Sequence, residues 1–195
     1  MGSEQPTDIN ISLSSFDEDI ESGSLVATLS TTDQDSGDTH TYTFADGEGD
    51  SDNSLFTIDG NQLKINHSPD YEIKSSYQIR LRTTDSSGLT LEKSFTFSVN
   101  NIDYEPTDIS LSSVNIRENI DADSAVAIIS TTDPDIGETQ TYELVGGEGD
   151  DDNNQFSIDG TLLKINASPD YETKSTYKIR LKTIDASGLS YEKTF

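Results

Sequence analysis

The sequence contains one unit of about 100 residues written twice, and this repetition constrains the fold more than any other feature. The segment PTDI at Pro6 returns at Pro106, and SPDYE at Ser68 returns unchanged at Ser168. The offset is 100 at each match, without insertion or deletion, and more than half of the aligned positions are identical. Internal repetition at this length indicates tandem copies of one folding unit.

The repeat length predicts the domain organisation, since domains most often contain about 100–150 residues. We expect a first repeat over residues 6–103 and a second over residues 104–195, after a leader at residues 1–5 derived from expression. The second repeat ends at Phe195, earlier than its counterpart in the first, so its last strand is predicted to be truncated.

Each repeat is predicted to be all-β. Residues 77–83, YQIRLRT, alternate apolar and polar side chains with a period of two, which indicates a half-buried strand rather than a helix. The first repeat contains six further strand candidates, at residues 9–13, 25–30, 41–45, 55–58, 62–66 and 92–99. Seven short strands separated by Gly, Asp, Asn and Ser clusters predict a two-sheet β-sandwich in each repeat.

The charge balance narrows the possible partners. Asp and Glu outnumber Lys and Arg by 37 to 12, which gives a net charge of −25. Such a surface repels nucleic acid and anionic lipid headgroups, and it favours a bound countercharge. Calcium is the expected ion, because hard cations bind carboxylate and carbonyl oxygens. The chain has no Cys, so disulfides and thiolate metal sites are excluded, and no apolar run is long enough to span a membrane.

The informative acidic residues lie in short patterns where predicted strands end, which places them at the poles of each sandwich. Because consecutive strands alternate in direction, the loops after the second and sixth strands share a pole, and the first-strand Glu can share the other pole with the PDYE segment if that strand switches sheets. This sorting predicts that six loop carboxylates face the junction of the repeats, and that two linker residues, Asn101 and Asp103, lie between them. The six are Glu18, Asp70 and Glu72 of the first repeat and Asp133, Asp135 and Asp185 of the second. Convergence is required, since a Ca²⁺ site needs about 6–8 oxygens.

These patterns resemble the cadherin-type repeats, and most closely the bacterial cadherin-like tandem repeats of large surface adhesins. Glu18 and Glu118 are similar to the family's Glu near the end of the first strand. The pairs at residues 33–35 and 133–135 resemble its DxD motif, and the PDYE segments resemble its LDRE motif. The linker, residues 99–106, is similar to the family's DxNDNxP only in part.

The resemblance implies a Greek-key sandwich of the cadherin or immunoglobulin-like type, Ca²⁺ between successive domains, and a secreted or cell-surface location. It implies an adhesive role in which the ions stiffen the linker. The expected partners are neighbouring repeats of the same chain and another cell-surface protein or a polysaccharide. In this interpretation, Asp33, Asp35 and Asp85 form half of a site completed by a preceding repeat. Glu118, Asp170 and Glu172 form half of a site completed by a following one.

The sequence also bears on two other functions, catalysis and polysaccharide binding. Catalysis is not expected, because the acidic residues fall in exposed polar loops and neither His40 nor His67 recurs in the second repeat. A polysaccharide-binding module with structural calcium is the alternative, since Tyr42, Tyr71 and Tyr77 recur and tyrosine rings with carboxylates suit sugars. The place of Tyr77 in an alternating strand predicts that it is a core residue.

Overall fold

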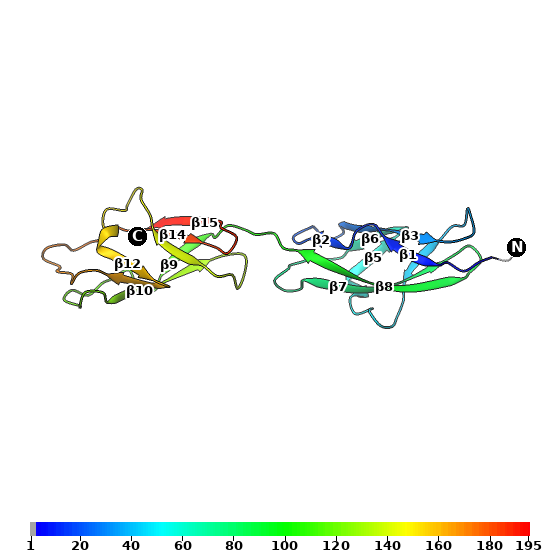
Figure 1. Ribbon diagram of the computed structural model, residues 1–195, viewed down its shortest axis with the longest axis horizontal. Helices are drawn as coiled ribbons and strands as arrows, with labels where there is room; N and C mark the ends of the chain where they lie inside the picture. Colours follow the sequence, from blue (N-terminus) through cyan, green and yellow to red (C-terminus); the bar gives the residue numbers. More distant parts are fainter. Residues whose placement is uncertain (1–2) are drawn as a thin grey trace. The chain divides into compact units, whose positions relative to one another are not determined.

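The computed structural model describes residues 3–195 and divides into two compact units, the first ending at Ile102 and the second beginning at Asp103. Each unit consists of two β-sheets around a hydrophobic core of its own (Figure 1). The predicted all-β fold with two tandem sandwich domains is confirmed.

The first unit has eight strands and one short 3₁₀ turn, η1 (Asn53–Leu55). The strands are β1 (Asp8–Ile11), β2 (Ser15–Asp17), β3 (Leu25–Thr32), β4 (Thr41–Phe44), β5 (Phe56–Asp59), β6 (Gln62–Ile65), β7 (Ser76–Thr84) and β8 (Thr90–Asn100). One sheet has the order β1-β3-β6-β5 and the other the order β2-β8-β7-β4. All the pairings are antiparallel except that of β2 with β8.

The core of the first unit follows from the alternation of apolar residues. In β7, Tyr77, Ile79 and Leu81 are buried while the residues between them are exposed or half-buried. These side chains meet apolar residues of the facing sheet, and four aromatic rings pack together where the two sheets meet near β2. The rings belong to Phe16, Phe56, Tyr77 and Phe97. Burial of large aromatic side chains is a main source of stability in a domain of this size.

The first predicted strand differs from the structure in extent. The sequence predicted one strand over residues 9–13, whereas the chain forms β1 in one sheet and then crosses to form β2 in the other. The switch between sheets on which the sorting of the poles depended is therefore present, and it gives this unit eight strands where seven candidates were predicted. A sequence pattern could not reveal β2, because its three residues are held by parallel pairing with the distant end of β8.

The second unit has seven strands and a second 3₁₀ turn, η2 (Asn153–Gln155). The strands are β9 (Asp108–Leu111), β10 (Ala125–Thr132), β11 (Thr141–Leu144), β12 (Phe156–Asp159), β13 (Leu162–Ile165), β14 (Arg180–Ile184) and β15 (Ser190–Thr194). They form sheets of order β12-β13-β10-β9 and β11-β14-β15. Among the described residues, no strand of this unit corresponds to β2.

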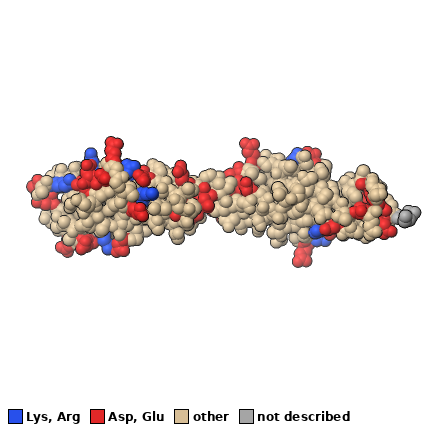
Figure 2. Space-filling view, turned by 45° about the horizontal axis from the view of Figure 1, so that its top comes forward, with Lys and Arg blue, Asp and Glu red and all other residues tan. Residues whose placement is uncertain are grey.

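Carboxylates dominate the charged surface. In Figure 2, acidic side chains greatly outnumber basic ones on the face presented. Some of the lysines form ion pairs within their own unit. Lys93 Nζ lies 2.7 Å from a carboxylate oxygen of Asp8, and Lys193 Nζ lies 2.7 Å from a carboxylate oxygen of Asp108. These contacts lower the pKa of both carboxyls, chiefly through the hydrogen bond from the lysine.

Candidate metal centres

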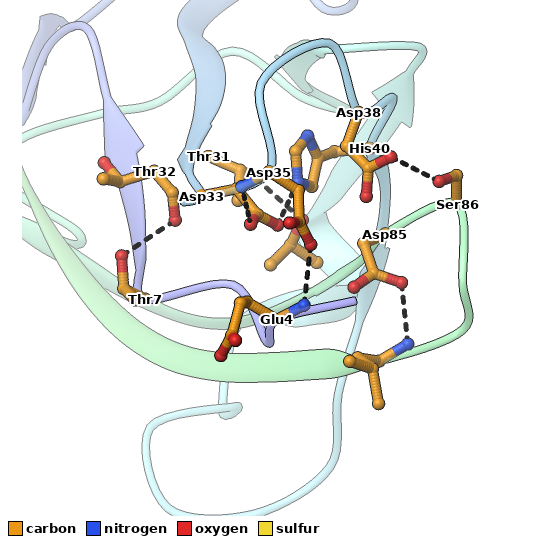
Figure 3. Close-up of polar contacts among 12 residues, drawn as sticks. Glu4, Thr7, Thr31, Thr32, Asp33, Asp35, Asp38, His40, Asp85 and Ser86 are labelled. Carbon is orange, nitrogen blue, oxygen red and sulfur yellow. Dashed lines mark hydrogen bonds and ion pairs between the residues drawn. The ribbon is translucent and has the colours of Figure 1, made fainter. Parts of the chain in front are cut away.

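In the loop after β3, an acidic side chain accepts a hydrogen bond from the backbone of the same loop, which fixes the position of its carboxylate. Asp33 follows β3, and its Oδ1 accepts the Asp35 amide N–H at 3.0 Å, while its Oδ2 lies 3.0 Å from His40 Nε2 (Figure 3). The pKa of the Asp33 carboxyl is lowered, first by the Asp35 N–H and then by His40. The Glu4 N–H donates to Asp35 Oδ2 at 2.6 Å, so the segment before β1 is attached to the same loop.

Two further acids reach this loop. Asp85 follows β7 and is 5% exposed; its Oδ1 accepts the N–H groups of Ser87 and Leu89, both at 2.8 Å. Asp38 accepts a hydrogen bond from Ser86 through Oδ1. Ligand atoms of Asp33, Asp38 and Asp85 lie within 4.8 Å of one another. The remaining oxygens, Oδ2 of Asp38 and Oδ2 of Asp85, are buried without a hydrogen-bond partner.

The second unit has a carboxylate group at the corresponding loop, but only Glu138 matches a member of the first group, Asp38. Ligand atoms of Asp103, Asp135 and Glu138 lie within 4.8 Å of one another, and Asp135 is 3% exposed. The Tyr104 N–H donates to Asp135 Oδ2 at 2.7 Å, as Glu4 does to Asp35 in the first unit. Burial raises the pKa of the Glu138 carboxyl, and the neighbouring carboxylates of Asp135, Asp185 and Asp103 raise it further.

Asp133 has a different position from the one expected for a direct ligand. Its Oδ1 accepts the Asp135 N–H at 3.0 Å and its Oδ2 accepts the Gln140 side-chain N–H at 2.7 Å. Neither of the two groups of three acids in this unit includes it. Asp185 is closer to the expectation, since it follows β14, is 6% exposed and has a buried Oδ2 without a hydrogen-bond partner.

The other pole of the first unit gathers a third group. Ligand atoms of Glu18, Asp70 and Glu72 lie within 4.8 Å of one another. Glu18 is 4% exposed; its Oε2 accepts the Tyr71 N–H at 2.9 Å and its Oε1 accepts the Ile102 N–H at 2.7 Å. Asn101, the remaining predicted residue, is exposed directly before Ile102.

The matching pole of the second unit is less enclosed. Glu118, Asp170 and Glu172 also bring ligand atoms within 4.8 Å of one another, but all three residues are exposed. Glu118 Oε2 accepts the Tyr171 N–H at 3.3 Å. Hydrogen bonding from the Thr173 hydroxyl lowers the pKa of the Asp170 carboxyl.

The donor chemistry of these groups fits calcium. Every side chain in the four groups is a carboxylate, and a buried carboxylate oxygen without a donor is costly unless a cation compensates it. Oxygen-only donor sets match Ca²⁺, whereas zinc prefers nitrogen and sulfur ligands. The unpartnered oxygens of Asp38, Asp85, Glu138 and Asp185 lie in or beside two of these groups. Bound Ca²⁺ would supply positive charge at these oxygens.

Sequence reasoning missed Asp38 and Glu138. Both lie three residues after the second Asp of the DxD pattern, and both follow a glycine with a positive φ, 94° at Gly37 and 96° at Gly137. Glycine adopts a positive φ without steric cost, and the turn at this position brings the acid that follows into the carboxylate group. The signal was available, because an acid occupies this position in both repeats.

We expect Glu138→Gln to raise the melting temperature of the second unit by a few degrees when calcium is chelated. The substitution removes a carboxylate that burial and three neighbouring acids disfavour, so it relieves repulsion in the metal-free protein. The exposed Glu143 on β11 offers a control with the same change in charge. Differential scanning calorimetry in excess chelator measures both, and equal effects of Glu138→Gln and Glu143→Gln would contradict the local origin of the repulsion.

Comparison with known proteins agrees with this architecture. A family model described as "Cadherin domain" matches residues 13–100. Human protocadherin Fat 4 is 31% identical over 180 residues, which cover 88% of this chain and 4% of that protein. Human protocadherin-1 is 30% identical over 179 residues, covering 87% of this chain and 16% of that protein.

Solved structures show the same fold. The crystal structure of human protocadherin-24 EC1-2 in its form II covers 98% of this chain and 94% of its own, with a TM-score of 0.68 and 19% identity. The protocadherin GammaB4 extracellular domain covers 100% of this chain and 32% of its own, with a TM-score of 0.67 and 22% identity.

The family model matches most of the first unit, and the two protocadherins are similar to the chain over most of both units. The chain spans only 4% and 16% of the two human proteins. Within residues 3–195, no helix is long and apolar enough to cross a membrane.

Proposed function

We propose that this chain is a calcium-binding tandem cadherin-like segment of a surface or secreted adhesion protein, and that Ca²⁺ stiffens the connection between its units. One observation supports this most directly. Consecutive residues belong to two carboxylate groups: the Ile102 N–H is bonded to Glu18, and Asp103 is grouped with Asp135 and Glu138. A cation that orders both groups restricts the backbone at residues 102–103.

The proposed ligands are the carboxylates and the amide predicted from the sequence, with Glu138 added. They are Glu18, Asp70, Glu72, Asn101, Asp103, Asp133, Asp135, Glu138 and Asp185. Asp133 is the weakest member of the set, because both of its oxygens already accept hydrogen bonds within the loop. Its role in this proposal is to orient Asp135, whose N–H it accepts.

The stiffening has an electrostatic cause. The chain carries a net charge of −25, so carboxylates gathered near the connecting residues repel one another when no cation is bound. When two or more Ca²⁺ ions are bound, each carboxylate is attracted to the cations, and this attraction outweighs the repulsion between the carboxylates. The metal-free chain is then a flexible pair of units, and the calcium-bound chain is a stiff one.

Small-angle X-ray scattering tests this proposal on the intact chain. Going from excess chelator to millimolar calcium, we expect a larger maximum dimension and a narrower distribution of distances. Sodium chloride at matched ionic strength controls for simple screening. Identical scattering curves in chelator and calcium would contradict the stiffening.

The partners follow from this role and remain proposals. Neighbouring repeats of the same chain and another cell-surface protein are the partners that an adhesion segment requires. The bacterial origin suggested by the sequence stays a prediction. The polysaccharide-binding alternative loses one of its three tyrosines, because Tyr77 is 2% exposed and packs in the aromatic cluster.

A further inference from the structure

Two acidic loops of the second unit extend from strands that belong to opposite sheets. The loop of Asp133 and Asp135 follows β10, and Asp185 follows β14. Strand β10 lies in the sheet of order β12-β13-β10-β9, and β14 lies in the sheet of order β11-β14-β15. Apolar packing between facing sheets is non-directional. A fixed separation between these loops therefore requires a directional contact between the sheets.

A buried pair of hydroxyls provides such a contact where the two strands end. The side-chain oxygens of Thr131 on β10 and Thr183 on β14 lie 2.7 Å apart, which is a hydrogen-bond distance. Thr183 is 0% exposed. Each threonine comes two residues before an acid, Asp133 in one loop and Asp185 in the other. The hydrogen bond thus joins the two sheets where their acidic loops begin.

Gln140 extends this contact into the loop after β10. Its Oε1 accepts the Thr183 hydroxyl at 3.0 Å, and its Nε2 donates to Asp133 Oδ2 at 2.7 Å. Because an ionised carboxylate can only accept hydrogen bonds, this orientation of the amide satisfies both neighbours. Asp133 Oδ1 in turn accepts the Asp135 N–H at 3.0 Å. A continuous series of hydrogen bonds therefore connects β14 to the backbone of Asp135.

The first unit has the same hydroxyl pair but a different side chain beside it. The oxygens of Thr31 and Thr83 lie 2.7 Å apart, and Thr83 is 0% exposed. At the place of Gln140 this unit has His40, whose Nε2 lies 3.0 Å from Asp33 Oδ2 (Figure 3). Among the hydrogen bonds of residues 3–195, none joins His40 to Thr83. The side-chain link from the hydroxyl pair to the acidic loop is thus a feature of the second unit.

The size of the ion makes this link relevant to the choice of cation. Mg²⁺ demands ligand distances of about 2.0–2.1 Å in octahedral geometry, whereas Ca²⁺ is bound at about 2.3–2.6 Å in flexible geometry. Acidic loops that can approach each other adapt to the smaller ion, and loops held apart do not. The hydroxyl pair does not need Gln140 for its own satisfaction, because Thr131 Oγ1 also lies 3.1 Å from the Tyr142 hydroxyl. The contribution of Gln140 is therefore to the acidic loop.

We propose that Gln140 and Thr183 are positioning residues that hold the loops after β10 and β14 at a fixed separation. This separation makes the carboxylate group of the second unit prefer Ca²⁺ to Mg²⁺. The group is that of Asp103, Asp135 and Glu138. Neither Gln140 nor Thr183 binds the ion itself. The inference rests on the proposed calcium function and adds to it two uncharged side chains that lie outside the four carboxylate groups.

Separate titrations of the intact, isotope-labelled chain with Ca²⁺ and with Mg²⁺ test this proposal. The amide chemical shifts of Asp135 and Glu138 report on their own group. We expect Gln140→Met and Thr183→Val to weaken calcium binding there about tenfold or more, the lower end of the range for residues that orient metal ligands, and to change magnesium binding less. The ratio of calcium to magnesium affinity therefore falls. Thr183→Ser keeps a hydroxyl and should restore the ratio.

Two controls separate this effect from a general loss of stability. Thr83→Val removes the matching hydroxyl from the first unit, where His40 is not bonded to it, and should leave the ratio at the group of Asp33, Asp38 and Asp85 unchanged. Thr161→Val, at an exposed turn, should also change nothing. If Thr183→Val unfolds the second unit, Gln140→Met at its half-buried position still decides the outcome. An equal fall in the ratio with Thr83→Val would overturn the role assigned to Gln140.

Amide hydrogen exchange in excess chelator measures the positioning without a bound ion. Gln140→Met should speed exchange of the Asp135 N–H roughly two- to tenfold, the factor that corresponds to the net contribution of one hydrogen bond. The Asp35 N–H is bonded to Asp33 in the same way in the first unit, and its exchange rate should not change. An unchanged rate at Asp135 would overturn the proposed positioning.

The unsubstituted chain separates this inference from the proposed function. If calcium causes no shift at Asp135 and Glu138 in that chain, the proposed function fails, and the selectivity assigned to the group fails with it. If the unsubstituted chain binds calcium and both Gln140→Met and Thr183→Val keep its ratio of calcium to magnesium affinity, the proposed function stands and this inference is overturned. A lower ratio in these two variants, with recovery in Thr183→Ser, is the expected result.

Discussion

Millimolar calcium is expected to raise the melting temperature of the chelator-treated chain by about 5–20 °C. Extracellular calcium modules bind with dissociation constants near 10⁻⁴–10⁻³ M, so ~10 mM calcium exceeds them by about 10–100-fold. Binding to the folded state alone then contributes about 1.4–2.7 kcal/mol per site. For domains of about 100 residues, each kcal/mol corresponds to roughly 4–8 °C.

The physical reason lies in the unpartnered oxygens. Asp38, Asp85, Glu138 and Asp185 each bury one carboxylate oxygen without a hydrogen-bond donor. The metal-free fold bears this cost, and the unfolded chain does not, because water solvates its carboxylates. Calcium removes the cost only in the folded state, so it stabilises that state.

Calorimetry with two controls checks this result. Magnesium at equal concentration should produce a smaller shift, since it holds its water shell and demands octahedral geometry. Sodium chloride at equal ionic strength measures screening alone. If calcium and sodium chloride gave the same melting temperature, the carboxylate groups would not be calcium sites.

The sequence was sufficient for the parts of the fold that depend on local pattern. The 100-residue offset and the alternation in β7 predicted tandem sandwiches, and the structure has them. The short strand β2 was not predictable, because Ser15–Asp17 contains a single large apolar residue. Its pairing partner, the end of β8, lies more than 80 residues away in the chain. Strands held by long-range pairing leave little trace in a local window.

The acidic groups show the same division between local and non-local information. Sequence reasoning placed acids from separate loops at shared poles, and the structure brings together Glu18, Asp70 and Glu72. The recurrence of an acid at positions 38 and 138 marked this position, but the DxD pattern alone did not indicate which acids of the loop after β10 point inward. That depends on the turn at Gly137, which brings Glu138 into the group with Asp135, whereas Asp133 bonds to its own loop.

A double-mutant cycle gives the sharpest expected result on the connection between the units. Glu18→Gln changes the group that holds the Ile102 N–H, and Asp135→Asn changes the group that contains Asp103. Each substitution keeps the size of the side chain and removes one negative charge, so each should weaken calcium binding at least about tenfold at its own group. Asp151→Asn, at an exposed position outside all four groups, should leave the affinity unchanged.

The combined variant distinguishes a shared assembly of ions from independent sites. If the ions at residues 102–103 are bound as one assembly, the losses in calcium affinity should be non-additive by about 0.5–3 kcal/mol, the range found for residues in one network. Independent sites should add within about 0.3–0.5 kcal/mol. Isothermal titration calorimetry supplies the affinities and the number of ions, and additive losses would contradict the idea that calcium joins the two units. Non-additive losses accompanied by a more flexible scattering profile would tie the stiffness of the chain to Glu18 and Asp135 together, because neither group alone can restrain both sides of the bond between Ile102 and Asp103.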